Sequence, residues 1–339
     1  MGGNLDTIII NQDDVAALLS MGACIDAMEG VLRGLELGEC ELPLRQIMWL
    51  PGRVGALGLM PSYWSAAATI GLKAVTYFPG NEGTSLDSHQ GAVLLYDATC
   101  GRLVAMVDAT SITAIRTAAV SAVATKLLAR DDAATLAIIG SGVQASMHLD
   151  AMLLCRRIEH VRVCSKTPAR ASAFAAAHGG RPGVTVESTA SVEAAVRDAD
   201  IICTTTSSSE PVLMGDWLRP GMHINAVGSS TASARELDAR AVARCRLFVD
   251  RRASAVAEAG DVVLAKADGA IGDDHILGEI GEVLEGKTAG RTARDDMTLF
   301  KSVGLAVEDL AAAVCVVEEA RRDGAGLRVA FGGARRATD

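Results

Sequence analysis

The stretch Leu136-Ala-Ile-Ile-Gly140-Ser-Gly142-Val-Gln-Ala145 combines a short apolar run with a glycine-rich turn. The apolar run is typical of a buried strand, and residues 144–153 follow a helical pattern. Gly140 suits a tight turn, Gly142 allows the backbone to approach a pyrophosphate, and Ala145 permits close packing of helix on strand. Free N–H groups at the start of that helix favour phosphate groups. The stretch therefore predicts a dinucleotide-binding site.

Short β-branched runs recur after this stretch, and alanine-rich helical segments separate several of them. These runs are residues 161–165, 184–187, 201–204, 223–227 and 246–249. Strands that alternate with helices indicate βαβ units, in which a parallel sheet is covered on both faces. We therefore predict the α/β class, with a Rossmann doubly wound parallel sheet that binds its cofactor at the carboxyl ends of the strands.

The chain before this sheet has a different pattern and predicts an α+β substrate domain. Strands are expected at residues 7–10, 57–60, 70–78, 91–96 and 103–108. Helices are expected at residues 25–37 and 113–128. Another helix would start near Val15, with Asp13 or Asp14 as its N-cap. We expect this domain to comprise residues 1–118, with residues 303–330 packing back onto it through a helix at 303–321. The Rossmann domain would comprise residues 119–302, and the tail at 331–339 would be frayed.

The end of the second predicted Rossmann strand helps to distinguish NAD from NADP. An Asp or Glu at this position usually binds the ribose 2′-hydroxyl of NAD. This chain instead has Ser165, Lys166 and Thr167, with Arg170 nearby. These residues offer a hydroxyl, an ammonium and a guanidinium to a 2′-phosphate, and no carboxylate repels it. The pattern favours NADP(H), with NAD(H) also possible, unless Lys166 and Arg170 only solvate the start of a helix.

Composition limits the class of protein further. A chain of 339 residues can form two domains, and its net charge of −9 argues against a nucleic-acid-binding surface. No apolar run approaches transmembrane length by this reading, because Glu308 and Asp309 interrupt the best candidate at 305–317. Residues 1–6 lack the features of a secretory signal. The eight cysteines are scattered without a metal-binding spacing, which indicates a reducing, cytoplasmic compartment with neither disulfides nor zinc.

Three cationic residues lie in otherwise apolar stretches of the first domain. Lys73 lies in the predicted strand at 70–78, Arg116 lies in the apolar segment 112–119, and Arg45 lies at 42–46. Because an unpaired buried charge is costly, cations in such surroundings usually meet an anion. Each residue alone is more simply explained as a snorkelling or salt-bridged surface residue. Together, and beside a dinucleotide fold, they favour a pocket for a substrate carboxylate.

Several segments make the chain similar to the ornithine cyclodeaminase/mu-crystallin family, and the resemblance runs from about residue 8 to residue 317. The segments that carry it are Leu57-Gly-Leu-Met-Pro61, Gly71-Leu-Lys73, Ser88-His-Gln90, Thr113-Ala-Ile-Arg-Thr-Ala-Ala119, Gly140-Ser-Gly-Val-Gln-Ala145, Asn225-Ala-Val-Gly-Ser-Ser230, Glu258-Ala-Gly-Asp261 and Phe300-Lys-Ser-Val-Gly-Leu-Ala-Val-Glu-Asp309.

This resemblance implies a homodimer-forming substrate domain that binds small amino or imino acids. The net charge and the lack of a transmembrane run argue against nucleic acid and membrane as partners. Arg45, Lys73 and Arg116 would bind the substrate carboxylate. The expected cofactor contacts, taken together with those argued above, are Arg116, Thr117, Gly140, Gly142, Val143, Gln144, Ser165, Lys166, Thr167, Arg170, Thr205, Thr206, Val227, Gly228, Lys301, Ser302 and Val303.

Two departures from the family pattern bear on the reaction. Cyclodeaminases of the family carry a Glu before Leu-Met-Pro, where this chain has Gly58, and an Asp where it has Ser230. Those carboxylates suit a substrate with a second amine, because a carboxylate can serve as base and as partner of an ammonium. The resemblance therefore favours the ketimine reductase branch: NADPH-dependent reduction of Δ1-pyrroline-2-carboxylate or Δ1-piperideine-2-carboxylate to L-proline or L-pipecolate.

The proton for the imine nitrogen has several candidate holders. Ser230, Ser229, His89 or a water would serve, although His89 also suits a structural role and the serines can bond backbone at a strand end. Lys73 and Arg116, with Ser230, are the expected catalytic residues. Other functions remain open: ornithine cyclodeaminase itself, an alanine- or iminosuccinate-type dehydrogenase, and a non-catalytic NADP-dependent ligand-binding protein.

Overall fold

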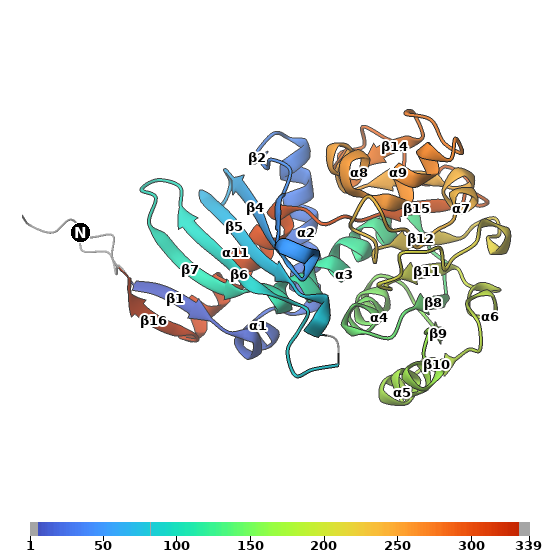
Figure 1. Cartoon of the computed structure of the whole chain (residues 1–339), viewed down its shortest axis with the longest axis horizontal. Coiled ribbons are helices and arrows are strands. Elements are labelled where there is room, and N and C mark those ends of the chain that lie inside the picture. The colour runs from blue at the N-terminus through green and yellow to red at the C-terminus, as the bar shows by residue number, and fades with distance from the viewer. Residues whose placement is uncertain (1–5, 82, 332–339) are drawn as a thin grey trace, which may run out of the picture. The chain divides into compact units, whose positions relative to one another are not determined.

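A computed structural model of the chain describes residues 6–81 and 83–331 (Figure 1). It divides into two compact units, one formed by the chain up to Arg116 and from Leu305 onward, the other by Thr117–Gly304. We call them the first and the second unit. The tail expected to be frayed lies, from residue 332, outside the described residues.

The first unit is built on a mixed sheet with the order β16-β1-β7-β6-β5-β4-β2, and β3 also pairs with β4. Strands β4 to β7 follow one another in antiparallel fashion, whereas β1 is parallel to β7. The strands are β1 (Asp6–Ile10), β2 (Cys40–Glu41), β3 (Gln46–Trp49), β4 (Ala56–Trp64), β5 (Thr69–Tyr77), β6 (His89–Asp97), β7 (Leu103–Asp108) and β16 (Leu327–Ala330).

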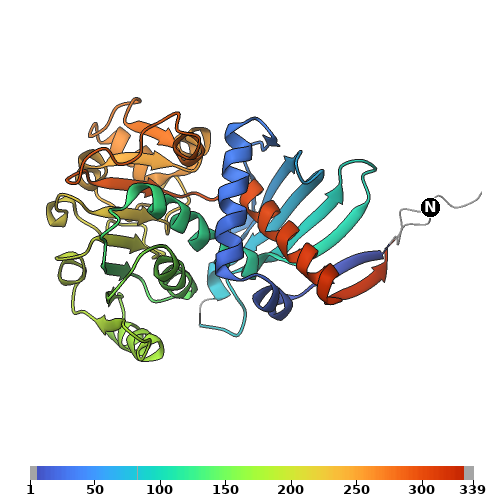
Figure 2. The same cartoon turned by 180° about the vertical axis from the view of Figure 1, so that it is seen from behind.

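Two long helices cover one face of this sheet. Figure 2 shows α2 (Met21–Glu36, blue) and α11 (Ala306–Asp323, red) side by side across it, and α11 packs on β4, β5 and β6. Gly71 permits this approach, since a Cβ there would lie only 3.0 Å from Leu310 Cδ1. The shorter α1 (Gln12–Leu18) is capped by Asn11, whose side chain accepts from the Asp14 N–H at 2.9 Å. The expected cap at Asp13 or Asp14 was wrong, because both lie within the first turn.

The second unit contains a parallel sheet with the order β10-β9-β8-β11-β12-β15-β13-β14, which confirms the predicted fold class. Counted along the chain from β8, its first five strands have the order 3-2-1-4-5 of doubly wound dinucleotide-binding sheets. The strands are β8 (Thr135–Ile139), β9 (His160–Cys164), β10 (Thr185–Ser188), β11 (Ile201–Thr204), β12 (His223–Ala226), β13 (Arg246–Val249), β14 (Ile276–Glu279) and β15 (Thr298–Lys301).

Helices connect these strands and bury an apolar core against them. They are α4 (Val143–Cys155), α5 (Pro168–His178), α6 (Val192–Val196), α7 (Ala239–Arg244), α8 (Arg252–Glu258), α9 (Gly260–Ala267) and α10 (Ile280–Leu284). All residues of β11, β12 and β15 are buried, and Ile202, Ile224 and Leu299 contribute to the core. Strands that are buried on both faces carry no alternation of apolar and polar residues. The sequence analysis found β11 and β12 by their β-branched residues, and it missed β15, in which Thr298 is the only one.

Helix α3 (Ala109–Leu128) contains the division between the units, which falls after Arg116. This helix is long and apolar enough to cross a membrane. However, 78% of its apolar window is buried inside the protein, as in the core helix of a globular domain. The bent pair α1 and α2 passes the same test together, with an angle of 85° between them. The expectation that no apolar run approaches transmembrane length overlooked α3.

Two arginines bind carbonyl groups at the carboxyl end of α3. Arg156 donates to the carbonyls of Thr125 at 3.0 Å and of Ala129 at 3.1 Å, and Arg291 donates to that of Leu128 at 2.7 Å. Cations at the carboxyl end of a helix satisfy these acceptors and oppose the negative end of the helix dipole. The last turn of α3 is therefore held firmly within the second unit.

Candidate active site

Four buried charged residues meet in the first unit, and we call them the charge cluster: Lys73, Arg116, Glu308 and Asp309. The Asp309 carboxylate accepts from Lys73 Nζ and from Arg116 Nε, each at 3.0 Å. Arg116 also donates from Nη1 to Glu308 Oε2 at 2.9 Å. The side chains of the two acids are 0% exposed, those of Lys73 and Arg116 4% and 6%. Lys73 and Arg116, which were singled out from the sequence, thus share a carboxylate.

Local structure places these side chains together. Along β5, Gly71 and Lys73 are the buried residues, and α11 packs on this strand. Glu308 and Asp309 lie in the first turn of α11, where a negative charge is favourable because it faces the positive end of the helix dipole. A fourth hydrogen bond completes the cluster, since Lys73 Nζ also donates to Thr113 Oγ1 of α3 at 2.7 Å.

The charges in the cluster shift one another's titration. Burial lowers the pKa of Lys73 to about 8, with the charge of Asp309 opposing this effect and that of Arg116 adding to it. Burial alone would raise the pKa of Asp309, but the charges of Arg116 and Lys73 outweigh it and lower that pKa. Near neutral pH the cluster therefore holds a charged lysine beside a charged aspartate.

Arg45 and His89 lie in electrostatic reach of Lys73. Arg45 precedes β3 and is partly exposed, and its positive charge is one of the influences that lower the pKa of Lys73. His89 opens β6, is accessible to solvent, and packs its ring against Tyr77 with the centroids 4.7 Å apart. Its pKa is lowered by desolvation and, more weakly, by the charge of Lys73. Lys73 therefore interacts electrostatically with the other three predicted substrate residues of the first unit, which are Arg45, His89 and Arg116.

The sequence analysis missed the roles of Glu308 and Asp309, which it treated as breaks in an apolar run and as the end of one family-like segment. The usable signal was the same one that singled out the cations. Two carboxylates in a helix whose other residues are mostly apolar need buried partners, and buried cations had already been identified elsewhere in the chain.

The glycine-rich turn of the second unit leaves room for a phosphate. Gly140 has a φ of 121°, and a Cβ there would lie 2.6 Å from Thr205 Oγ1 and 2.8 Å from the Thr205 carbonyl oxygen. A Cβ at Gly142 would instead meet no atom within 4 Å. Gly142 is also the N-cap of α4 and, as a glycine, has no side chain to cap that helix. A crowded turn followed by an open glycine at the helix start fits a dinucleotide pyrophosphate.

The residues expected to bind the ribose follow β9. Ser165 is partly buried, and its Oγ accepts from Ser141 Oγ at 3.0 Å. Lys166, Thr167 and Arg170 are exposed in the next turn and at the start of α5. No carboxylate stands at the end of β9, so this position presents hydroxyl and cationic groups alone.

Most other predicted cofactor residues lie where parallel strands end. Thr205 and Thr206 follow β11, Val227 and Gly228 follow β12, and Ser302 and Val303 follow β15. Val143 and Gln144 lie in the first turn of α4, and Val143 is 61% exposed. Thr117 is buried in α3, at the start of the second unit. These strand ends form the edge at which doubly wound sheets bind their ligands.

Three predicted residues are engaged with other groups of the second unit. Lys301 is completely buried, with Nζ 3.1 Å from both Asp261 Oδ2 and the Ala226 carbonyl oxygen. Ser229 is buried and its hydroxyl donates to the carbonyl of Ala234, whereas Ser230 is exposed. The Ser302–Gly304 segment is held by Asp250, which accepts from the N–H groups of Val303 and Gly304 at 2.8 Å each.

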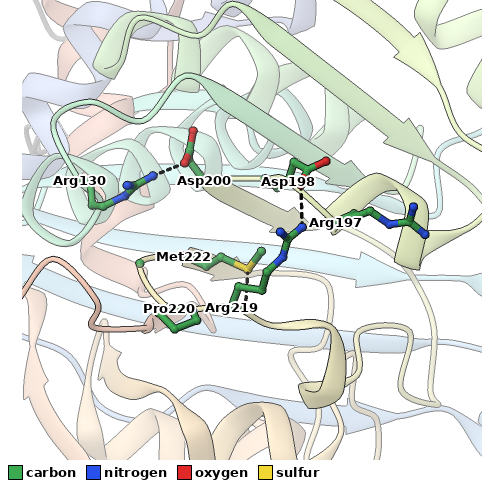
Figure 3. Close-up of a pocket in the computed structure, with 9 residues that line it drawn as sticks. Arg130, Arg197, Asp198, Asp200, Arg219, Pro220 and Met222 are labelled. Atoms are coloured by element: carbon green, nitrogen blue, oxygen red, sulfur yellow. Dashed lines mark hydrogen bonds and ion pairs between the residues drawn. The ribbon is translucent and has the colours of Figure 1, made fainter.

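A polar pocket of about 240 Å³ lies elsewhere in the second unit (Figure 3). Its lining includes Asp200 and Met222, which directly precede β11 and β12, so it occupies the amino end of the sheet. Arg130 pairs there with Asp200, and Arg219 with Asp198 at 2.8 Å. Because this pocket lies at the opposite edge from the glycine-rich turn, we assign it no part in the active site. Among the described residues, no His, Cys, Asp and Glu side chains form a metal-binding group.

Comparison with known proteins identifies the family that was expected from the sequence. The profile of the ornithine cyclodeaminase/mu-crystallin family matches residues 5–324. The ketimine reductase mu-crystallin of Mus musculus is 41% identical over 304 residues, which cover 89% of this chain and 93% of the mouse protein.

Two solved structures share the fold over nearly the whole chain. The Thermococcus litoralis Δ1-pyrroline-2-carboxylate reductase, in complex with NADH and L-proline, has a TM-score of 0.92 and 36% identity, covering 95% of this chain and 100% of that one. An archaeal alanine dehydrogenase dimer with bound NAD has a TM-score of 0.91 and 31% identity, covering 96% and 100%.

Asp309→Asn should destabilise the protein strongly. We expect the free energy of unfolding at pH 7 to fall by about 3–5 kcal/mol, because two buried cations lose the carboxylate that they share. The matched control is Glu319→Gln on the same helix, where the carboxylate pairs at the surface with Arg322, and its effect should stay below about 0.5 kcal/mol. Denaturant unfolding measures both. Equal effects of the two variants would contradict the assignment of Asp309 as the shared counter-ion.

Proposed function

Because this chain belongs to the ornithine cyclodeaminase/mu-crystallin family, we propose that it reduces cyclic 2-imino acids with NADPH. Δ1-Pyrroline-2-carboxylate and Δ1-piperideine-2-carboxylate would yield L-proline and L-pipecolate. The chain is an oxidoreductase of this family, and its relatives include a ketimine reductase and a Δ1-pyrroline-2-carboxylate reductase. The choice of reaction depends on one observation: carboxylates are missing at Gly58 and Ser230.

The position of Gly58 in β4 shows which groups a carboxylate at this residue would face. Gly58 is paired with Val75 and Met60 with Lys73, so Gly58 lies on the same face of the sheet as Lys73. A carboxylate there would face the charge cluster and could serve a second amine of the substrate. A cyclic imine has no such amine, and a glycine suffices for it.

The charge cluster suits the carboxylate of an imino acid. The Lys73 ammonium has three N–H donors, of which Thr113 and Asp309 accept two. The third can be donated to a substrate carboxylate, with the guanidinium groups of Arg116 and Arg45 nearby. Glu308 and Asp309 hold the two buried cations in fixed orientations, which is the positioning that a reaction at the adjacent carbon requires.

The chemistry divides between the cofactor and the chain. The bound nicotinamide supplies a hydride for the imine carbon. The chain must hold a proton at the imine nitrogen, because an iminium accepts a hydride more readily than a neutral imine. The Ser229 hydroxyl is occupied by the Ala234 carbonyl, and the lowered pKa of His89 leaves its imidazole neutral at pH 7. Ser230, or a water that it holds, is therefore the proposed proton holder.

The imine reaction should be fast and ornithine cyclodeamination slow. We expect NADPH oxidation with Δ1-pyrroline-2-carboxylate and little or no ammonia from L-ornithine with NAD or NADP, since carboxylates are missing at Gly58 and Ser230. Steady-state absorbance and an ammonia assay measure the two reactions. Vigorous conversion of L-ornithine to L-proline with stoichiometric ammonia would overturn the proposal, and activity with alanine alone would favour a dehydrogenase like the archaeal relative.

The pH profile of the same reaction should show the loss of the Lys73 charge. Burial lowers the pKa of Lys73 from 10.5 to about 8, so the charged form is lost as the pH rises through about 8. The KM of the imino acid should rise above that pH, while lower pH speeds the reaction by supplying more iminium. A KM that stays constant up to pH 10 would remove Lys73 from the substrate site.

The preference for NADPH is proposed from the residues after β9. Losing one charge-assisted phosphate contact costs ~1.5–3 kcal/mol, so Lys166→Ala should reduce the ratio of kcat/KM for NADPH and NADH about tenfold or more. The control is Lys266→Ala, an exposed lysine that pairs with Asp273. The neighbouring structures contain NADH and NAD. Equal use of the two cofactors by the unmutated protein would refute the preference.

We also propose that a second copy of the chain covers the open face of the first sheet. Leu57, Leu59, Ile70 and Leu72 alternate with the residues that face α11, and Ile70 is 40% exposed. In β3 all residues are exposed, including Trp49. An apolar face of this kind marks a protein interface, and the similar archaeal alanine dehydrogenase is a dimer.

Ile70→Glu should convert the proposed dimer to a monomer, because a charge on the apolar face would have to be buried on association. The matched control is Leu154→Glu, since Leu154 is 59% exposed in α4 of the second unit. Light scattering after gel filtration measures the mass. A monomeric unmutated protein, or an Ile70→Glu variant that remains dimeric, would contradict this interface.

A further inference from the structure

One buried carboxylate in the second unit binds two loops at once. Glu236 lies between β12 and α7 and is 0% exposed. Its Oε1 accepts from the N–H of Thr206 at 2.6 Å and from Thr206 Oγ1 at 2.7 Å. Its Oε2 accepts from Thr204 Oγ1 at 2.8 Å and from the N–H of Gly228 at 2.6 Å. Glu236 thereby joins the end of β11 and the loop after it to the loop after β12.

The surrounding backbone is shaped to admit this carboxylate. A Cβ at Gly228 would lie 2.5 Å from Glu236 Oε1 and 2.0 Å from the Thr206 carbonyl oxygen, so no other residue fits without a backbone shift. Glu236 is itself held by Asp261, whose Oδ1 accepts from the N–H groups of Glu236 and Leu237 at 2.8 and 2.9 Å. Two carboxylates in series therefore determine where these loops lie.

The hydrogen-bond donors around Glu236 indicate that its side chain is an ionised carboxylate. In all four of these hydrogen bonds Glu236 is the acceptor, and an ionised carboxylate is the form that only accepts. Burial raises the pKa of Glu236, and the charge of Lys301 opposes this rise. Lys301 is also buried and lies 3.1 Å from Asp261 Oδ2. Its ammonium thus compensates for part of the negative charge in this network.

We propose that Glu236 is a positioning residue for the nicotinamide half of the cofactor. A doubly wound sheet consists of two mononucleotide-binding halves. The glycine-rich turn and Ser165 belong to the first half, while the loops that Glu236 joins lie in the second half and carry Thr205, Thr206, Val227 and Gly228. By fixing these loops, Glu236 prepares the nicotinamide site, whereas the residues after β9 that would bind the adenosine ribose lie outside these loops. The inference relies on the proposed function for its cofactor and is independent of the imino acid.

The test compares the whole cofactor with its adenosine half. In Glu236→Gln the amide has one acceptor oxygen and two donors, so half of the bonds to the loops are lost. We expect the Kd of NADPH to rise at least tenfold, while that of adenosine 2′,5′-bisphosphate changes less than twofold. Isothermal titration measures both without turnover. If the protein prefers NADH, the same comparison uses NADH and adenosine 5′-monophosphate.

Control variants separate positioning from general stability. Glu187→Gln removes an exposed carboxylate that pairs with Arg162 at 3.2 Å, and it should change neither affinity. Thr204→Val removes one hydrogen bond to Glu236 and keeps the carboxylate. It should therefore raise the Kd of NADPH by a smaller factor and leave that of adenosine 2′,5′-bisphosphate unchanged. Thr204→Ser, which keeps the hydroxyl, should bind NADPH as the unmutated protein does. This pair also carries the test if Glu236→Gln does not fold.

Two results would overturn the proposal. In the first, both ligands weaken equally in Glu236→Gln and Thr204→Val, together with a lower melting temperature, which indicates a purely structural role. In the second, the Kd of neither ligand changes in these variants. A protein that binds NADPH as expected but turns over no cyclic imine would refute the proposed reaction and leave the role of Glu236 standing.

Discussion

The Asp309 carboxylate, shared between the Lys73 ammonium and the Arg116 guanidinium, is the contact on which the first unit depends. A cation buried on the face of a sheet is tolerated only with a partner, and here the partner is 236 residues from Lys73 and 193 from Arg116. The ion pairs therefore require α11 to return across the sheet, and Gly71 gives that helix the space to do so. The same contact orients the cations that we expect to bind substrate.

The second unit uses buried carboxylates for a different purpose, because their partners are mostly backbone N–H groups. Glu236 binds the loops after β11 and β12, and Asp250 binds the segment after β15. Irregular loops at the edge of a sheet have few hydrogen bonds of their own. An internal acid supplies them without occupying the outer side of the loop. The strand ends can thus be rigid at the edge where a doubly wound sheet binds its cofactor.

Local patterns predicted most of the fold, and long-range contacts escaped the sequence analysis. The turn at Gly140 and the β-branched runs were recognised because each has a local cause in backbone freedom or strand periodicity. Strand β15 lacks such a signal, since Thr298 is its only β-branched residue, and the cap at Asn11 depends on where the first turn begins. Lys73 and Arg116 were identified as unusual cations. Their carboxylate partners were missed because a pairing across 236 residues leaves no periodic trace.

The order in which the chain is synthesised gives the charge cluster a further consequence. Lys73 and Arg116 leave the ribosome long before Asp309, whereas Thr117–Gly304 lies between them and forms the second unit by itself. Domains generally fold as units during synthesis, and usually the N-terminal one completes first. Here the order is reversed: the N-terminal sheet must wait, with its cations still solvated, until the last helix emerges. A truncated nascent chain would therefore contain a finished dinucleotide fold and an unfinished substrate domain.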